Sequence, residues 1–117
     1  MSDELEIFDI IVLQNLTEAI GDSANAIVKL YLEEVPNNII QMQQALIQDD
    51  LKTIGRLAHS LKSSSASLGA KQMSLLCAEL ESLINSGETQ KDKISSLIIK
   101  IQNNFDQVRP MFNDFLN

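Results

Sequence analysis

The sequence contains a single histidine, His59, and the residues around it suit phosphoryl chemistry. At helical spacing, the cations Arg56 and Lys62 lie one turn to either side of it, and the small residues Gly55 and Ser63 lie directly beside it. An exposed imidazole is a competent nucleophile at neutral pH, since much of it is unprotonated. A phosphoryl group in transfer spreads negative charge over oxygens that Lys62 can reach. Small neighbours would also let a partner protein approach the ring.

Charge is distributed unevenly along the chain, which carries a net charge of −7. Residues 51–71 contain no Asp or Glu and carry +4, so the remainder of the chain carries −11. An acid-free stretch of this length in an acidic protein indicates a local site for an anion. The overall negative charge argues against non-specific nucleic-acid binding, because that binding needs clustered Lys and Arg.

The segment around His59 is expected to form a helix that starts at the Asp49-Asp50 cap and ends near Leu68, with Gly69 in the left-handed conformation after it. One face of this helix is apolar and is expected to face the core: Ile54, Leu57, Ala58, Leu61, Ser65 and Leu68. The opposite face is expected to be exposed and to form the partner-docking surface: Lys52, Gly55, Arg56, His59, Lys62, Ser63 and Ala66.

The remaining segments also show helical spacing, and none alternates in the manner of a strand, so the fold class is all-α. A short helix is expected over 9–20, and longer helices over about 23–48, 71–86 and from 90 onward. The short helix has an apolar stripe: Phe8, Ile11, Val12, Leu16 and Ala19 or Ile20. Asp22 or Ser23 can cap the helix that follows. Pro36 should kink the second helix without breaking it, and Pro110 should bend or fray the end of the last one. We therefore expect one domain, residues 1–117: an antiparallel four-helix bundle with the short N-terminal helix covering one end.

No segment is a candidate membrane span or secretory signal, because the opening MSDELE is acidic and the longest aliphatic run is 10–13. The single Cys77 lies on an apolar stripe and is expected to be a buried thiol; one Cys and one His are too few for a zinc site. These features favour a monomeric cytoplasmic protein. Met1 and the complete last helix favour a free-standing chain over one excised from a hybrid kinase.

Residues 58–70 read AHSLKSSSASLGA, which resembles the signature of histidine-containing phosphotransfer (HPt) domains: Ala-His, then Leu-Lys, a small-residue cluster and a closing Leu-Gly-Ala. The resemblance extends over nearly the whole chain, including the helix interrupted by Pro36 and the string LCAELE at 76–81. The sequence departs from the pattern at Ser63, where many members have Gly. The added hydroxyl bears on how closely a partner can approach.

The resemblance implies that His59 accepts a phosphoryl group from a phospho-aspartate of a receiver domain and passes it to the aspartate of another response regulator. It implies that Lys62 stabilises the phosphoryl charge. The implied partners are receiver domains and a hybrid sensor histidine kinase. The sequence has no Gly-rich phosphate loop, so we expect no autokinase activity and no intrinsic cofactor, with Mg²⁺ bound by the receiver.

Two other functions are compatible with parts of the sequence. A non-catalytic helical adaptor needs only the bundle, but it leaves the acid-free segment unexplained. A small hydrolase or isomerase using His59 as a general base needs an orienting acid and a concave pocket, and the sequence offers neither. The sequence does not identify the upstream kinase, the downstream receiver, the direction of net phosphoryl flow or the pathway output.

Overall fold

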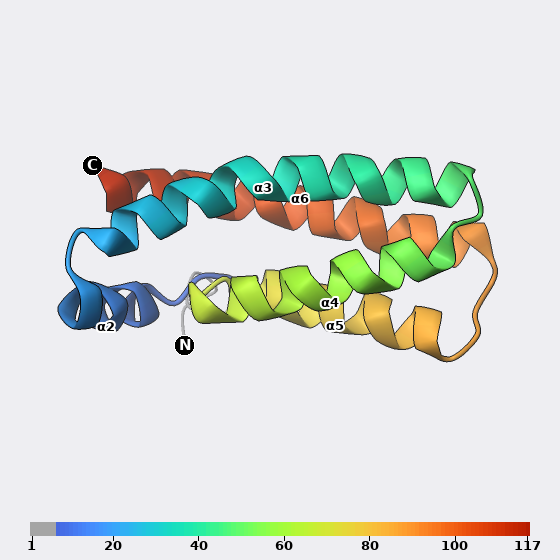
Figure 1. Cartoon of the computed structure of the whole chain (residues 1–117), viewed down its shortest axis with the longest axis horizontal. Helices are drawn as coiled ribbons and strands as arrows, with labels where there is room; N and C mark the ends of the chain where they lie inside the picture. Colours follow the sequence, from blue (N-terminus) through green and yellow to red (C-terminus); the bar gives the residue numbers. More distant parts are fainter. Residues whose placement is uncertain (1–6) are drawn as a thin grey trace.

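The structure, a computed structural model, describes residues 7–117 and is built from helices (Figure 1). The acidic opening segment, from which no secretory signal was expected, and Met1, which favoured a free-standing chain, lie outside the described residues. The helices, labelled as in Figure 1, are α2 (Ile10–Ile20), α3 (Ser23–Ile47), α4 (Leu51–Ser67), α5 (Lys71–Asn85) and α6 (Lys91–Leu116). The described part of the chain contains no strand, so the all-α prediction is confirmed.

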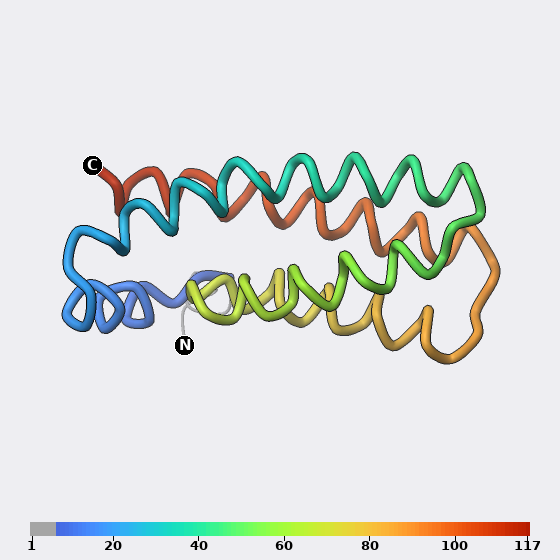
Figure 2. Tube along the Cα trace, viewed as in Figure 1, coloured from blue at the N-terminus to red at the C-terminus, as the bar shows by residue number. Residues whose placement is uncertain are grey.

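The four long helices form an antiparallel bundle in two layers (Figure 1). In one layer α3 lies beside α6, and in the other α4 packs extensively on α5. The trace in Figure 2 shows short connections at both ends of the bundle, and α2 lies at the end where α3 begins and α4 finishes. The predicted bundle, with its short helix covering one end, is therefore confirmed.

Capping residues set the ends of the helices that matter for the site. Asp50 accepts a hydrogen bond from the backbone N–H of Thr53 at 3.2 Å and so begins α4, as predicted. Asp22 precedes α3 but its side chain makes no capping bond, contrary to one of the two predicted caps for that helix. After α4, Gly69 has φ +85°, and its carbonyl accepts a hydrogen bond from the Asp9 N–H at 2.8 Å. This bond joins the segment entering α2 to the end of α4.

Both prolines lie inside continuous helices. Pro36 lacks an N–H and leaves one carbonyl of the preceding turn without its helical partner, yet α3 continues through it to Ile47. Pro110 lies inside α6, which stays helical to Leu116, so of the two predicted effects, a bend or fraying, the fraying is wrong. Both helices bury side chains on each side of their proline, Val35 and Ile39 in α3 and Val108 and Phe112 in α6, and this burial supports the helical conformation.

The core runs the full length of the bundle, and the predicted apolar stripe of α2 is correct only in part: Phe8 is buried and Val12 and Leu16 are partly buried, but Ile11 and Ile20 are exposed. Leu13 is fully buried, whereas Ile11, which the spacing assigned to the apolar stripe, is 55% exposed. Phe8, just before the helix, packs its ring edge-on against Phe112 of α6 with centroids 4.9 Å apart. A helix of eleven residues at the end of a bundle buries only part of its apolar surface, so its spacing alone did not fix the buried face.

Candidate functional site

Helix α4 presents His59 to solvent because its opposite face is buried. All six residues predicted for the core side are buried: Ile54, Leu57, Ala58, Leu61, Ser65 and Leu68. The helical period then forces position 59 to the outside, where the His59 side chain is 65% exposed. The predicted orientation of the ring is confirmed.

Glu81 of α5 joins the two polar side chains of the predicted site. Its Oε2 lies 2.6 Å from His59 Nδ1, and its Oε1 lies 2.6 Å from Lys62 Nζ. The contact arises because α4 and α5 are antiparallel neighbours joined by a short turn, which brings residues 22 apart in sequence together. One carboxylate therefore holds the imidazole and the ammonium group side by side.

The protonation state of Glu81 fixes which nitrogen of His59 is free. The hydrogen bond from Lys62 is the main cause that lowers the pKa of Glu81 below its usual 4.5; desolvation opposes it, and the His59 contact adds to the lowering. Glu81 is then ionised at neutral pH and can only accept hydrogen bonds. Nδ1 must therefore carry the proton and donate it to Glu81, which leaves the lone pair on Nε2.

The sequence-based statement that no acid is available to orient His59 is wrong, because Glu81 contacts the ring. Sequence reasoning missed it because residues 51–71 contain no acid and the partner comes from the next helix. Glu81 follows the buried Cys77 by one helical turn, so its place at the margin of the apolar face of α5 was readable from the sequence. Which side chain of α4 would lie opposite depends on the relative rotation of the two helices, which the sequence does not show.

A second unpredicted contact lies in the core beneath the site. The hydroxyls of Tyr31 in α3 and Ser65 in α4 are 2.7 Å apart, and both residues are buried. Ser65 was predicted to be core but was interpreted only as a small residue. On the other side of α4, Ser74 of α5 donates a hydrogen bond to the Lys62 carbonyl at 3.0 Å. These bonds fix α4 to the helices on either side of it.

The described residues contain no group of three or more His, Cys, Asp or Glu side chains that could hold a metal ion. Cys77 is buried as predicted, and desolvation raises the pKa of its thiol to about 12. No helix within residues 7–117 is both long enough and apolar enough to cross a membrane.

Comparison with known proteins identifies the family. The sequence model described as "Hpt domain" matches residues 26–110, a span that includes His59, Lys62 and Glu81. The chain belongs to the Hpt family. Hpt domains are phosphotransfer carriers.

Individual relatives agree with this assignment. The Multistep phosphorelay regulator 1 of Schizosaccharomyces pombe is 29% identical over 103 residues, which is 79% of the chain; the chain spans only 35% of the length of that relative. The crystal structure of histidine-containing phosphotransfer protein B from Pseudomonas aeruginosa PAO1 superposes with a TM-score of 0.88 at 26% identity, covering 94% of each chain. The HPT domain of a sensor hybrid histidine kinase from Shewanella has the same fold, with a TM-score of 0.80 at 20% identity, covering 96% of this chain and 95% of the other.

The structure of this Hpt domain distinguishes two groups among the predicted docking residues. Lys52, Arg56, Ser63 and Ala66 are exposed on the same side as His59. Gly55 is half-buried against α5, and a Cβ at this position would lie 3.2 Å from Cγ2 of Ile84. Its small size has a packing cause within the domain in addition to any effect on a partner.

Two apolar hollows flank the C-terminal half of α4 in the Hpt domain. One lies between α3 and α4 and is lined by Ile27, Leu30, Tyr31, Glu34, Ser64, Ser67 and Leu68. The other lies toward α2 and α5 and is lined by Val12, Ala66, Gly69, Lys71, Ser74 and Leu75. Ser64, Ala66 and Ser67 follow His59 by five to eight residues, which is about 8 to 12 Å along a helix. Both hollows therefore lie within reach of a partner that contacts His59.

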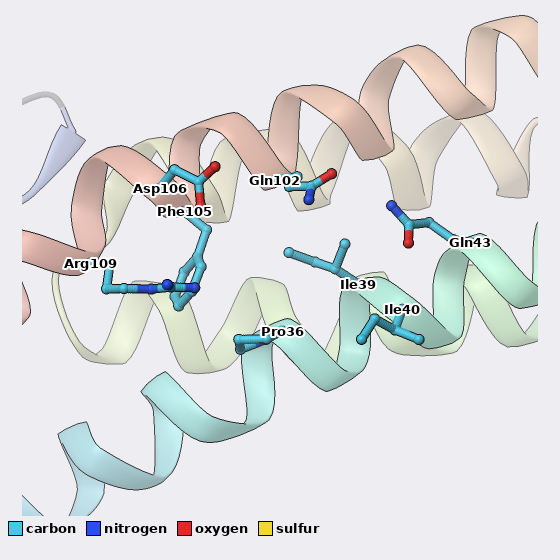
Figure 3. Close-up of a pocket in the computed structure, with 8 residues that line it drawn as sticks. All are labelled: Pro36, Ile39, Ile40, Gln43, Gln102, Phe105, Asp106 and Arg109. Carbon is cyan, nitrogen blue, oxygen red and sulfur yellow. The ribbon is translucent and has the colours of Figure 1, made fainter.

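A third hollow lies between α3 and α6, the helix pair that does not carry His59 (Figure 3). The Arg109 guanidinium lies over the ring of Phe105, 4.8 Å from its centroid, and Pro36 lines the opposite wall. No residue of the His59 site lines this hollow. This hollow is therefore separate from the His59 site.

Proposed function

We propose that His59 Nε2 accepts a phosphoryl group from a phospho-aspartate of a receiver domain and passes it to the aspartate of another response regulator. The observation that carries the proposal is the 2.6 Å contact between Nδ1 and Glu81, which leaves the exposed ring with its nucleophilic lone pair on Nε2. As Nε2 forms the bond to phosphorus, the bond from phosphorus to the aspartate oxygen breaks. The electron pair of that bond leaves with the aspartate.

The two neighbours of His59 have distinct roles in this transfer. Lys62 lies beside the ring and can place its ammonium group against the phosphoryl oxygens, whose negative charge it stabilises. Glu81 holds the ring in the Nδ1–H tautomer and compensates the positive charge that the ring gains when Nε2 bonds to phosphorus, as a buried carboxylate does for a catalytic histidine. Glu81 is therefore a positioning residue, whereas His59 and Lys62 contact the transferred group.

We further propose that a receiver domain docks on the exposed face of α4 and on the two hollows beside it. Lys52 and Arg56 complement the acidic site of a receiver, and Ser63 and Ala66 leave room for close approach. The half-exposed Leu30 and the Leu75 side chain, 64% exposed, supply apolar contact area on either side. A relay must release its partner after each transfer, so the contact should be small, about 1,200 Å² or less in total.

The chain needs other proteins to complete this relay. We propose that a hybrid sensor histidine kinase supplies the phosphoryl group, that this domain has no autokinase activity, and that the Mg²⁺ required for transfer is bound by the receiver. The domain then works as a monomer without a cofactor of its own. The relay begins with ATP, so we assign it to the cytoplasm.

Incubation with a phosphorylated receiver domain tests the proposal. The wild-type protein should acquire acid-labile phosphate, and His59→Gln should acquire none while keeping its helical content and thermal midpoint. Ser60→Ala is the matched control, because Ser60 is exposed and carries the hydroxyl next to His59 in the sequence. A folded His59→Gln protein that still takes up phosphate would overturn the assignment and leave a non-catalytic adaptor as the remaining function.

A further inference from the structure

The contact between Glu81 and His59 has a consequence for the phosphorylated protein. This inference rests on the proposed function. When Nε2 forms its bond to phosphorus and Nδ1 keeps its proton, the ring becomes a cation beside the Glu81 carboxylate. The same contact that orients the neutral ring then becomes an ion pair with the phosphorylated ring.

Release of the phosphoryl group depends on that proton. As an acceptor carboxylate or a water molecule attacks phosphorus, the electron pair of the N–P bond returns to Nε2. If Nδ1 still carries its proton, the leaving group is the neutral imidazole with which the cycle began, and no proton has to be moved. If Nδ1 has lost its proton, the leaving group is an imidazolide anion, which departs far less readily.

We propose that the Glu81 carboxylate keeps Nδ1 protonated while the phosphoryl group is on Nε2, and thereby sets the pH range in which His59 can give the group up. The carboxylate oxygen lies 2.6 Å from Nδ1, within the range of a charge-assisted hydrogen bond. An opposite charge at this distance favours the charged form of a titrating group. The carboxylate therefore stabilises the protonated, phosphorylated ring relative to the ring that has lost its proton.

The other charges near the ring do not cancel this effect. Lys62 is also cationic, but its ammonium group is paired with Oε1 of the same carboxylate at 2.6 Å. Arg56, one turn earlier on α4, is the other cation on the same face. Both cations can turn to the phosphoryl oxygens once these are present, while Glu81 remains the acid in contact with Nδ1. The lowered pKa of Glu81, caused chiefly by Lys62, keeps the carboxylate ionised throughout the neutral range.

Loss of the phosphoryl group to water tests the inference without a partner protein. Phosphoramidate, a small N–P donor, would be used to phosphorylate the wild type and Glu81→Gln, and the decay of phosphohistidine would be followed by ³¹P NMR between pH 5.5 and 9. Gln keeps the size and an acceptor oxygen of Glu81 but removes its charge. Glu79→Gln is the matched control, because Glu79 is an exposed acid on the same helix.

Near pH 5.5 the three proteins should lose phosphate at similar rates, because the ring is protonated in all of them. Near pH 8.5 Glu81→Gln should retain it about two- to fivefold longer than the wild type, the factor expected for one partly exposed ion pair. Glu79→Gln should follow the wild type at every pH. If Glu81→Gln loses helical content, Glu81→Met, which also removes the charge, should show the same longer retention of phosphate near pH 8.5.

The results separate the two proposals. If the decay profiles of the wild type and both Glu81 variants coincide, Glu81 has no effect on the phosphorylated ring and the inference is overturned, while the carrier function stands. If Glu79→Gln shifts the profile as much as Glu81→Gln, a general charge effect replaces the specific contact. If the wild type acquires no phosphate on His59, the proposed function fails, and the inference fails with it.

Discussion

Removing one hydroxyl from the Tyr31–Ser65 pair should measurably destabilise the bundle. The two hydroxyls are 2.7 Å apart, Tyr31 is 4% exposed, and Ser65 is fully buried, so neither can turn to water when its partner is lost. Leaving a buried polar group unpaired costs about 1 to 3 kcal/mol. Ser65 can instead donate to the carbonyl one turn earlier in α4, which places Tyr31→Phe at the lower end of that range. Desolvation raises the pKa of Tyr31 well above its usual value, so the phenol stays neutral over the whole working pH range.

A double-mutant cycle measures this contact. Urea unfolding of Tyr31→Phe, Ser65→Ala and the double variant should show each single change lowering the unfolding free energy by about 1 to 2 kcal/mol, which is about 4 to 8 °C in thermal midpoint. The double variant should lose about 1 kcal/mol less than the sum, because it leaves no hydroxyl unpaired. Strictly additive losses would refute the reasoning, since they would mean that the two hydroxyls do not interact.

The remaining predictions concern the site and its helix. Lys62→Ala should slow transfer in both directions by about tenfold without unfolding the bundle, as measured with a phosphorylated receiver; unchanged kinetics would remove Lys62 from the mechanism. Ser63→Phe should leave stability within about 0.5 kcal/mol but strongly impair transfer, and chemical-shift mapping of the receiver contact to α5 and α6 alone would contradict this. Gly55→Ala should change the unfolding free energy by less than about 0.5 kcal/mol, because the gain in helix propensity offsets a 3.2 Å approach to the γ2 methyl group of Ile84; a larger loss would show that α5 cannot yield. The pKa of Glu81 is lowered in the folded state, so the contribution of its ionised form to stability is complete above about pH 4.5 and is lost as the pH falls through the folded-state pKa. The difference in thermal midpoint between the wild type and Glu81→Gln should therefore disappear on acidification. A difference that persists at pH 2 would contradict this prediction.

Features set by a single helix were predictable from the sequence. The exposure of His59 follows from the buried spacing of α4 itself, and the Asp50 cap needs only residues within four positions. The four-helix arrangement follows from helix number and short connections. Each of these depends on local periodicity, which a sequence displays directly.

Features that depend on two helices were not predictable in the same way. The contact between His59 and Glu81 requires a particular rotation and offset of α5 against α4, and a shift of one residue would turn Glu81 by about 100° away from the ring. Tyr31 and Ser65 meet for the same reason across the α3 and α4 contact. The apolar stripe predicted for α2 was wrong in part, because it included the exposed Ile11 and left out the buried Leu13. Only a small part of a short end helix is buried, so its spacing alone did not decide between these positions.

The turn at Gly69 bears on how relatives of this chain can be recognised. A Cβ at this position would lie 2.5 Å from the Asp9 carbonyl oxygen, and the backbone there has φ +85°, so both the space and the conformation require glycine. The closing Leu-Gly-Ala of the motif therefore records how the segment before α2 docks on the end of α4, about 15 Å along the helix from His59. The glycine is therefore evidence for this docking and not for the nucleophile, so a relative is recognised as a carrier only where a histidine also occupies the position of His59.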